Sequence, residues 1–343
     1  MKPLDPAWTP YTPDDSAPWD LRRAAHLHRR AGFAATWPEL QRDLKDGPAA
    51  AIDRLLAGKA TMHSPAEFES TSRLLGDAAV AANEPARLKA WWFYRMLFGT
   101  DPLGEKLTLT WHNHFATAFS KVADLGAMRR QNDTFRKLAR APFGELVNAA
   151  VREPALLVWL DAPANRKGHA NENLGRELME LFTLGVGNYT EADVKEAARA
   201  LTGWTVEDGK FAEVAARHDA DEKTILNKKG KWTGSDLVKI LLESPATANR
   251  LAWRLCDVFF GERAVSPEAM ASLADGLRER NLDLGWAITT ILKSKAFFAD
   301  ANIATRIKGP VEFIVGAARA LEMFDPAPST LALADWCARM GQD

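Results

Sequence analysis

Asn171-Glu-Asn-Leu-Gly-Arg-Glu-Leu-Met-Glu-Leu-Phe-Thr-Leu-Gly185 contains the signals for both ends of a helix. The side chain of Asn171 can accept a hydrogen bond from a backbone N–H of the first turn, and Gly185 can adopt the left-handed conformation that ends a helix. At about 100° per residue, four apolar side chains fall on one side: Leu174, Leu178, Leu181 and Phe182. The stretch therefore predicts one continuous α-helix with this face in the core.

Signals of the same kind recur along much of the chain. Pro245, Pro267 and Pro310 each stand where a helix is expected to begin, and proline is favoured at the first helical position because its missing N–H is not needed there. Thr190 with Asp193 has the spacing of a capping box. The fold class predicted from these signals is all-α, a multi-helix array.

Two regions depart from the helical pattern. Residues 1–18 contain five prolines and no apolar periodicity, which predicts an extended N-terminal arm. Asp208-Gly209 supplies the positive φ angles of a tight turn, so one small β-hairpin is expected near residues 204–214. Residues 19–343 are then expected to form a single helical domain, with a polar hairpin and loop insertion at about 204–235.

Composition excludes several classes of function. The formal net charge of −1 provides no overall attraction to nucleic acid. The longest apolar run, residues 155–160, is too short to cross a membrane, and no signal peptide is visible, so the sequence as given predicts a cytoplasmic protein without a membrane span. Cys256 and Cys337 lie far apart, which argues against a disulfide framework or a thiolate zinc site.

The polar side of the 171–185 helix carries the first candidates for chemistry. Glu177 and Glu180 are spaced i, i+3 and should project from one face. Together with His218 and Asp219 in a polar loop, they could perform general acid–base catalysis. A structural polar network and a solvated face, with Arg176 paired to Glu180, are the alternatives.

A divalent metal ion is the possible cofactor. Carboxylates on one helix, joined by imidazoles from another segment, can hold such an ion. The tentative ligands are His112, His114, Glu177 and Glu180. On a regular helix over residues 105–122 the two histidines would point about 200° apart, so they could share an ion only if that helix breaks. The alternative is two partly buried histidines with separate hydrogen-bond partners.

Several stretches resemble the bacterial "domain of unknown function 1800" family. They are His26 to Phe33, Trp111 to Thr117, Gly168 to Gly187, Ala197 to Trp204, His218-Asp219 with Lys223-Thr224, and Ile307 to Phe313. The resemblance runs in one order over nearly the whole chain, and it suggests a C-terminally shortened member, since relatives continue beyond Asp343. It implies no settled activity. Relatives commonly look exported, which would place the protein in the periplasm, and often accompany a protein resembling sulfatases and phosphatases.

Two hypotheses for the function follow from different classes. The first is a hydrolase-like enzyme, metal-assisted or not, that acts on an extracellular or envelope polymer through the Glu/His/Asp cluster. The second is a non-catalytic helical scaffold for the sulfatase- or phosphatase-like partner. Convergence of the candidate side chains would favour the enzyme, and dispersal would favour the scaffold.

Overall fold

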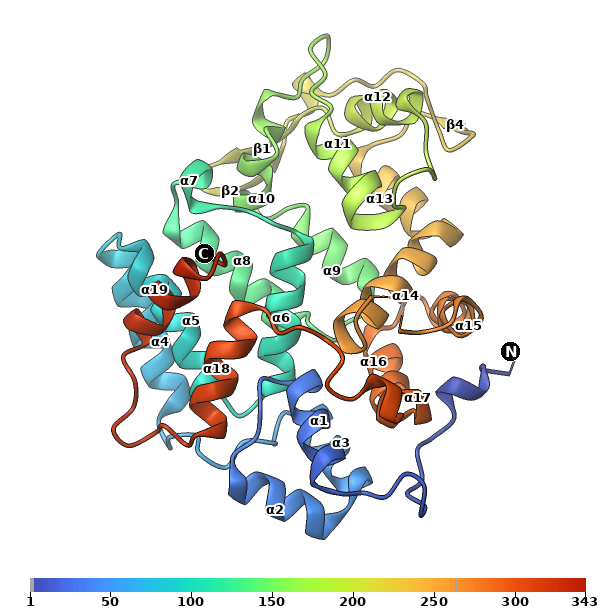
Figure 1. Ribbon diagram of the computed structural model, residues 1–343. Coiled ribbons are helices and arrows are strands. Elements are labelled where there is room, and N and C mark those ends of the chain that lie inside the picture. The colour runs from blue at the N-terminus through green and yellow to red at the C-terminus, as the bar shows by residue number, and fades with distance from the viewer. Residues whose placement is uncertain (1–2, 263) are drawn as a thin grey trace. The chain divides into compact units, whose positions relative to one another are not determined.

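The computed structural model describes residues 3–262 and 264–343, and these are mostly α-helical (Figure 1). The all-α prediction is therefore confirmed, and the predicted prolines begin α14, α15 and α18. The capping box of Thr190 and Asp193 is also present, at the start of α12. Residues 1–2 of the predicted N-terminal arm lie outside the described residues.

The helices of the described residues have the following bounds: α1 (Leu21–Ala31), α2 (Trp37–Asp46), α3 (Pro48–Leu56), α4 (Phe68–Ala81), α5 (Pro85–Phe98), α6 (Pro102–His114), α7 (Phe119–Val122), α8 (Leu125–Lys137), α9 (Phe143–Ala150), α10 (Pro154–Trp159), α11 (Asn173–Glu177), α12 (Glu191–Ala200), α13 (Gly234–Leu242), α14 (Pro245–Phe259), α15 (Pro267–Glu279), α16 (Leu284–Lys293), α17 (Lys295–Phe298), α18 (Pro310–Ala320) and α19 (Thr330–Arg339). The π-helix is η3 (Leu178–Thr183), and the 3-10 helices are η1 (Pro6–Trp8), η2 (Ala162–Ala164), η4 (Ala215–Arg217) and η5 (Asp300–Asn302). The strands are β1 (Trp204–Glu207), β2 (Lys210–Glu213), β3 (Lys223–Ile225) and β4 (Lys228–Gly230).

The described chain forms two compact units. The central unit consists of Thr110–Arg254 and Leu273–Gly285, and the terminal unit consists of the described residues of Lys2–Leu109, Leu255–Ser272 and Trp286–Asp343. The chain passes from one unit to the other inside α6, α14, α15 and α16. Because these four crossings lie inside helices and not in flexible linkers, the amino-acid composition does not reveal the boundary between the two units.

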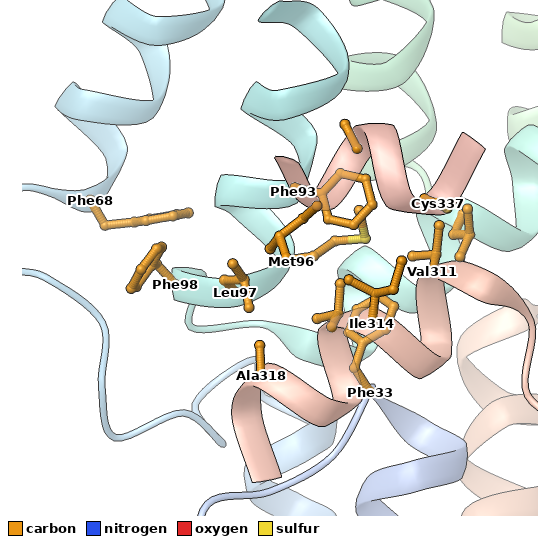
Figure 2. Packing of buried hydrophobic residues seen from close by; sticks show 14 residues of the cluster. Phe33, Phe68, Phe93, Met96, Leu97, Phe98, Val311, Ile314, Ala318 and Cys337 are labelled. Atoms are coloured by element: carbon orange, nitrogen blue, oxygen red, sulfur yellow. The ribbon is translucent and has the colours of Figure 1, made fainter. Parts of the chain in front are cut away.

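The terminal unit has an aromatic and aliphatic core (Figure 2). Helix α5 packs against α4, α18 and α19 there. Phe93, Met96 and Leu97 come from α5, and Val315 comes from α18, all of them buried. The N-terminal arm is tied to the same unit, because the indole N–H of Trp8 donates to the carbonyl of Ala269 at 2.8 Å.

The central unit contains the predicted hairpin and a second one that was not predicted. Strands β1 and β2 pair antiparallel around Asp208-Gly209, as expected. Strands β3 and β4 also pair antiparallel, in a stretch predicted to be polar loop. Their turn, Leu226-Asn227, takes positive φ angles of 48° and 64°. The prediction missed it because leucine rarely adopts this conformation, so the pair lacks the usual turn signature.

Helix α6 ends earlier than predicted. The sequence favoured one helix through Val122, but α6 ends at His114, and Ala118 is extended (φ −133°, ψ 139°) before the short α7. The hydroxyl of Thr117 donates to the side chain of Gln131 on α8 at 2.7 Å. This contact with another helix depends on tertiary structure, so the apolar spacing could not reveal the break. Within the described residues, every helix is too short or too polar to cross a membrane.

Candidate functional site

The stretch predicted as one α-helix contains a π-helical segment. Helix α11 ends at Glu177, and Leu178–Thr183 continue as η3, where the amide of Leu184 donates to the carbonyl of Met179 at 2.8 Å. The hydroxyl of Thr183 donates to the carbonyl of Leu178, five residues earlier, at 2.6 Å. Turns of this kind are rare and occur frequently at functional sites.

The π-helix changes which side chains face the core. Residues are buried at intervals of four, namely Leu174, Leu178 and Phe182 on one row and Gly175, Met179 and Thr183 on the next. Leu181, which was predicted to lie in the core, is 44% exposed. That prediction is wrong because it assumed the α-helical rotation of about 100° per residue through the whole stretch. Gly185 has φ +82°, the left-handed conformation predicted for it.

Helix α11 lies very close to α12 (Figure 1). A Cβ atom at Gly175 would stand 3.1 Å from the backbone nitrogen of Ala198. This close approach holds the first turn of the predicted helix firmly against its neighbour. The Glu177 end of α11 is therefore positioned by backbone packing.

Glu177 and Glu180 form a pair of carboxyl groups without an arginine between them. Partial burial raises the pKa of Glu177, and the charge of Glu180 raises it further, while Arg176 only partly offsets both effects. Arg176 instead bonds Glu172 at 3.0 Å and Glu191 at 2.7 Å. The predicted pairing of Arg176 with Glu180 is therefore wrong.

Tyr189 connects this carboxyl pair to a groove. Its hydroxyl donates to Oε2 of Glu180 at 2.5 Å, and burial together with this bond raises the pKa of Tyr189 to about 12. Tyr189 also lines an open groove of about 830 Å³, formed by Gly187, Asn188, Tyr189, Thr190, Ala192, Asp193, Lys195, Glu196, Thr224, Leu226 and Asn227. No sequence pattern singled out Tyr189 as a functional residue. Its contact with Glu180 arises because the loop after η3 turns back, which no periodic signal reports.

His218 and Asp219 lie at the other end of α12. Nδ1 of His218 is 3.0 Å from the carbonyl of Thr202, and the amide of Asp219 donates to the Thr202 hydroxyl at 2.7 Å. Arg199 donates to Asp219 at 2.8 Å and lowers the pKa of that carboxyl group. Helix α12 has ten residues, and ten residues span about 15 Å. These two residues therefore fasten a loop to the C-terminal end of α12, away from Tyr189 at its N-terminal end.

His112 and His114 have separate partners, as the alternative interpretation predicted. Nε2 of His112 is 3.0 Å from Nδ2 of Asn132. Nε2 of His114 is 3.1 Å from the carbonyl of Phe182, and Arg254 donates to its Nδ1 at 3.4 Å. Burial, with a further contribution from the charge of Arg254, lowers the pKa of His114 to about 3. The His114 ring is therefore neutral at pH 7, donating from Nε2 and accepting at Nδ1.

The four tentative metal ligands are not gathered by these contacts. Within residues 3–262 and 264–343, no group of three or more His, Cys, Asp or Glu side chains is arranged to hold a metal ion. The pair Glu177 and Glu180 has Tyr189 as its third polar neighbour. Binding of a divalent ion by this pair stays a prediction. The two carboxyl groups and the Tyr189 hydroxyl are groups suited to proton transfer.

A family model described as "Protein of unknown function (DUF1800)" matches residues 26–343. The chain belongs to the DUF1800 family. The DUF1800 match includes the π-helix, both glutamates, Tyr189 and the whole groove. No curated protein and no solved structure matches the chain. Because the description of DUF1800 states no activity, the chemistry of the site has to be inferred from its geometry.

Proposed function

We propose that this DUF1800 protein is an enzyme, a hydrolase that uses Glu177 and Glu180 for acid–base catalysis on a polar polymer bound in the groove beside Tyr189. The observation that carries the proposal is a carboxyl group with a raised pKa placed next to a second carboxylate at a π-helical turn. Two neighbouring carboxyl groups in different environments are the usual means by which one site supplies both an acid and a base.

The two carboxyl groups have different roles in this proposal. Glu177 retains its proton more readily, because its surroundings raise its pKa, and it is the general acid that protonates the leaving group. Glu180 is oriented by the hydroxyl of Tyr189 and is the general base that takes a proton from water. Tyr189 keeps its own proton at neutral pH, since its pKa is about 12, and it holds Glu180 in one rotamer.

The groove favours an extended polar substrate. Its volume of about 830 Å³ accommodates several sugar or peptide units, and its lining includes Asn188, Asp193, Lys195 and Glu196. Such side chains exchange hydrogen bonds with hydroxyl and amide groups. An envelope polymer as the substrate, and the periplasm as the location, are proposed on the resemblance of the sequence to exported relatives. His218 and Asp219 position the loop at the far end of α12 and are not among the residues that line the groove, so we assign them no step in the reaction.

The first experiment tests the carboxyl pair without a known substrate. ¹³C NMR titration of the Glu177 carboxyl group should give a pKa above its ordinary value, and the Glu180→Gln variant should lower it, because a neighbouring negative charge is removed. Glu172→Gln is the matched control, since Glu172 precedes the same helix but bonds Arg176. An ordinary pKa for Glu177, unchanged by Glu180→Gln, would remove the basis of the proposal.

The second experiment measures release of soluble fragments from dye-labelled peptidoglycan and envelope polysaccharides. Glu177→Gln should reduce turnover by about 10²–10⁴-fold, the usual contribution of a general acid or base. Tyr189→Phe should reduce it less, because the carboxylates remain. Turnover equal to wild type in Glu177→Gln would contradict the assigned role. Elemental analysis and chelator treatment of the same samples test the metal-assisted version, which predicts a bound divalent ion and loss of turnover with chelator.

The alternative is a non-catalytic scaffold for a sulfatase- or phosphatase-like partner. It predicts that no polymer is cleaved and that Glu177→Gln, Glu180→Gln and wild type are indistinguishable in every assay except partner binding. Co-purification with the partner encoded beside the gene, unaffected by both substitutions, would favour this alternative.

A further inference from the structure

Two guanidinium groups share one exposed indole ring on α14. Cζ of Arg250 lies 4.4 Å from the centroid of the Trp253 ring, and Cζ of Arg254 lies 5.9 Å from it. Trp253 is 37% exposed although it is a large apolar side chain. Spacings of three and four residues place these side chains on one face of the helix. The surface of the central unit thus has a cationic patch built around an aromatic ring.

Arg250 has no acidic partner among the residues that the structure describes. Burial lowers its pKa, and no carboxylate opposes that effect. Its Nε–H is buried without an acceptor. The backbone of Gly185 covers this side of the guanidinium, since a Cβ atom built there would lie 3.4 Å from Cδ and 3.9 Å from Nε. A half-buried cation without a counter-charge is costly unless something else supplies the negative charge.

The neighbouring imidazole does not supply that charge. His114 accepts a hydrogen bond from Arg254, and the positive charges of Arg254 and Arg250 help to keep its pKa low. The ring is therefore neutral, and both arginines keep their charge. Both guanidinium groups lie within 5.9 Å of the centroid of the Trp253 ring, so their positive fields add there.

We propose that Arg250, Arg254 and Trp253 form a binding site for an oxyanion, that is, a phosphate, sulfate or carboxylate group on a ligand. The Nη atoms of Arg250 meet the oxyanion, because its Nε is covered, and a planar guanidinium group binds such an anion with two parallel hydrogen bonds. The charge of Arg254 beside the same indole ring adds to the attraction. The exposed face of Trp253 contacts the apolar part of the molecule that carries the anion. The site is independent of the proposed acid–base reaction at Glu177 and Glu180.

Two other arginines differ from Arg250 in this respect. Arg339 pairs with Asp335 at 2.8 Å, and Arg54 pairs with Asp43 at 2.6 Å. These arginines have a carboxylate within the protein and need no ligand. Arg339 is 75% exposed and provides the matched control for the loss of one arginine.

The test is isothermal titration of the full chain with inorganic phosphate, sulfate and acetate in a buffer of low ionic strength, since salt screens such a site. Arg250→Met, which keeps an unbranched apolar side chain, should weaken phosphate binding about tenfold or more, because a charged hydrogen bond contributes about 1.5–3 kcal/mol and 1.4 kcal/mol is tenfold. Arg339→Met should bind as wild type does. Comparison of the three anions distinguishes a phosphate or sulfate site from a carboxylate site.

A second measurement does not depend on the folding of Arg250→Met. In protein labelled with 5-fluorotryptophan, phosphate should shift one of the twelve tryptophan ¹⁹F resonances, and that resonance should be missing in Trp253→Phe. The proposal is overturned if none of the three anions binds saturably to wild type. It is also overturned if a folded Arg250→Met binds phosphate as well as Arg339→Met does, or if phosphate shifts resonances other than that of Trp253.

Discussion

The buried carboxyl groups of Glu39 and Glu312 in the terminal unit have a different environment from the half-buried groups of Glu177 and Arg250 in the central unit. In the terminal unit, Arg319 donates to Glu39 at 3.0 Å with both side chains almost fully buried, and Lys106 and Arg306 both bond Glu312. Burial alone would raise the pKa values of Glu39 and Glu312, but these cationic partners hold both below their ordinary values. These charges are matched inside the protein, so removal of one partner alone would leave an uncompensated buried charge.

The central unit leaves charges of both signs without such a match. Glu177 has a second carboxylate as its neighbour and a raised pKa, and among the residues that the structure describes Arg250 has no carboxylate partner. Perturbed groups of this kind occur preferentially at functional sites. Burial of a charge therefore does not by itself mark a candidate site, and each of the two proposed sites contains a half-buried charge that no opposite charge fully offsets.

The largest effect is expected from breaking a matched pair. Arg319→Met should lower the free energy of unfolding by about 3–5 kcal/mol, because it leaves Glu39 buried and uncompensated. Chemical denaturation measures the change. The double variant with Glu39→Leu should recover part of the loss, since both charges are then absent. A loss below about 1 kcal/mol would mean that Arg319 and Glu39 contribute no more than a surface ion pair. The contrast between the two units would then not hold for the terminal unit.

The second-largest effect on the free energy of unfolding is expected at the apolar face of the π-helix, which is buried in the central unit. Leu178→Ala should cost about 2–5 kcal/mol through lost burial and a cavity. Leu181→Ala, at an exposed position only three residues away, should cost less than about 0.5 kcal/mol. Thermal and urea unfolding of the two variants decides the matter. Equal effects would indicate that the stretch is an ordinary α-helix with Leu181 in the core.

A smaller effect should appear in the pH dependence of stability. The pKa of His114 is lowered to about 3, whereas an unfolded histidine titrates near about 6.5, so the unfolded chain binds more protons between these values. The free energy of unfolding should therefore fall as the pH drops from about 6.5, with a limiting slope of about 1.4 kcal/mol per pH unit from this group. His26, with its pKa lowered to about 4, contributes in the same direction from the terminal unit.

The variant His114→Gln should reduce that slope between pH 6.5 and 5, a range above the ordinary pKa values of the carboxyl groups. Urea denaturation at several pH values measures it, with wild type as the reference. An unchanged slope would show that His114 is accessible to protons in the folded protein, contrary to the neutral ring inferred from its two hydrogen bonds.

The smallest effect on stability is expected at the proposed acid. Glu177→Gln should leave the free energy of unfolding within about 0.5 kcal/mol of wild type or raise it slightly, because it removes repulsion from Glu180 without orphaning a partner. Glu39→Gln should be clearly destabilising, since Arg319 then loses its counter-charge. Melting temperatures of the two variants provide the comparison. A strong destabilisation by Glu177→Gln would assign Glu177 to a structural network.

Local sequence signals were sufficient for the helical class and for many element boundaries. Pro310, the capping box at Thr190 and the Asp208-Gly209 turn each act through contacts within a few residues, so a single stretch contains all the information needed. The i, i+3 spacing of Glu177 and Glu180 is local in the same sense, and it agrees with the effect of the Glu180 charge on the pKa of Glu177.

Contacts between distant segments determined the features that the local signals did not predict. The α-helical period failed after Glu177, where the chain continues as the π-helix and Leu181 turns outward. Tyr189 contacts Glu180 because the loop after η3 folds back. His218 lies at the other end of α12 because its loop is bonded there by Thr202 and Arg199. No segment of the described chain that packs beside Arg250 supplies a carboxylate. Periodicity describes only which way a side chain points from its own helix, whereas these outcomes depend on hydrogen bonds and charges supplied by segments far away in the sequence.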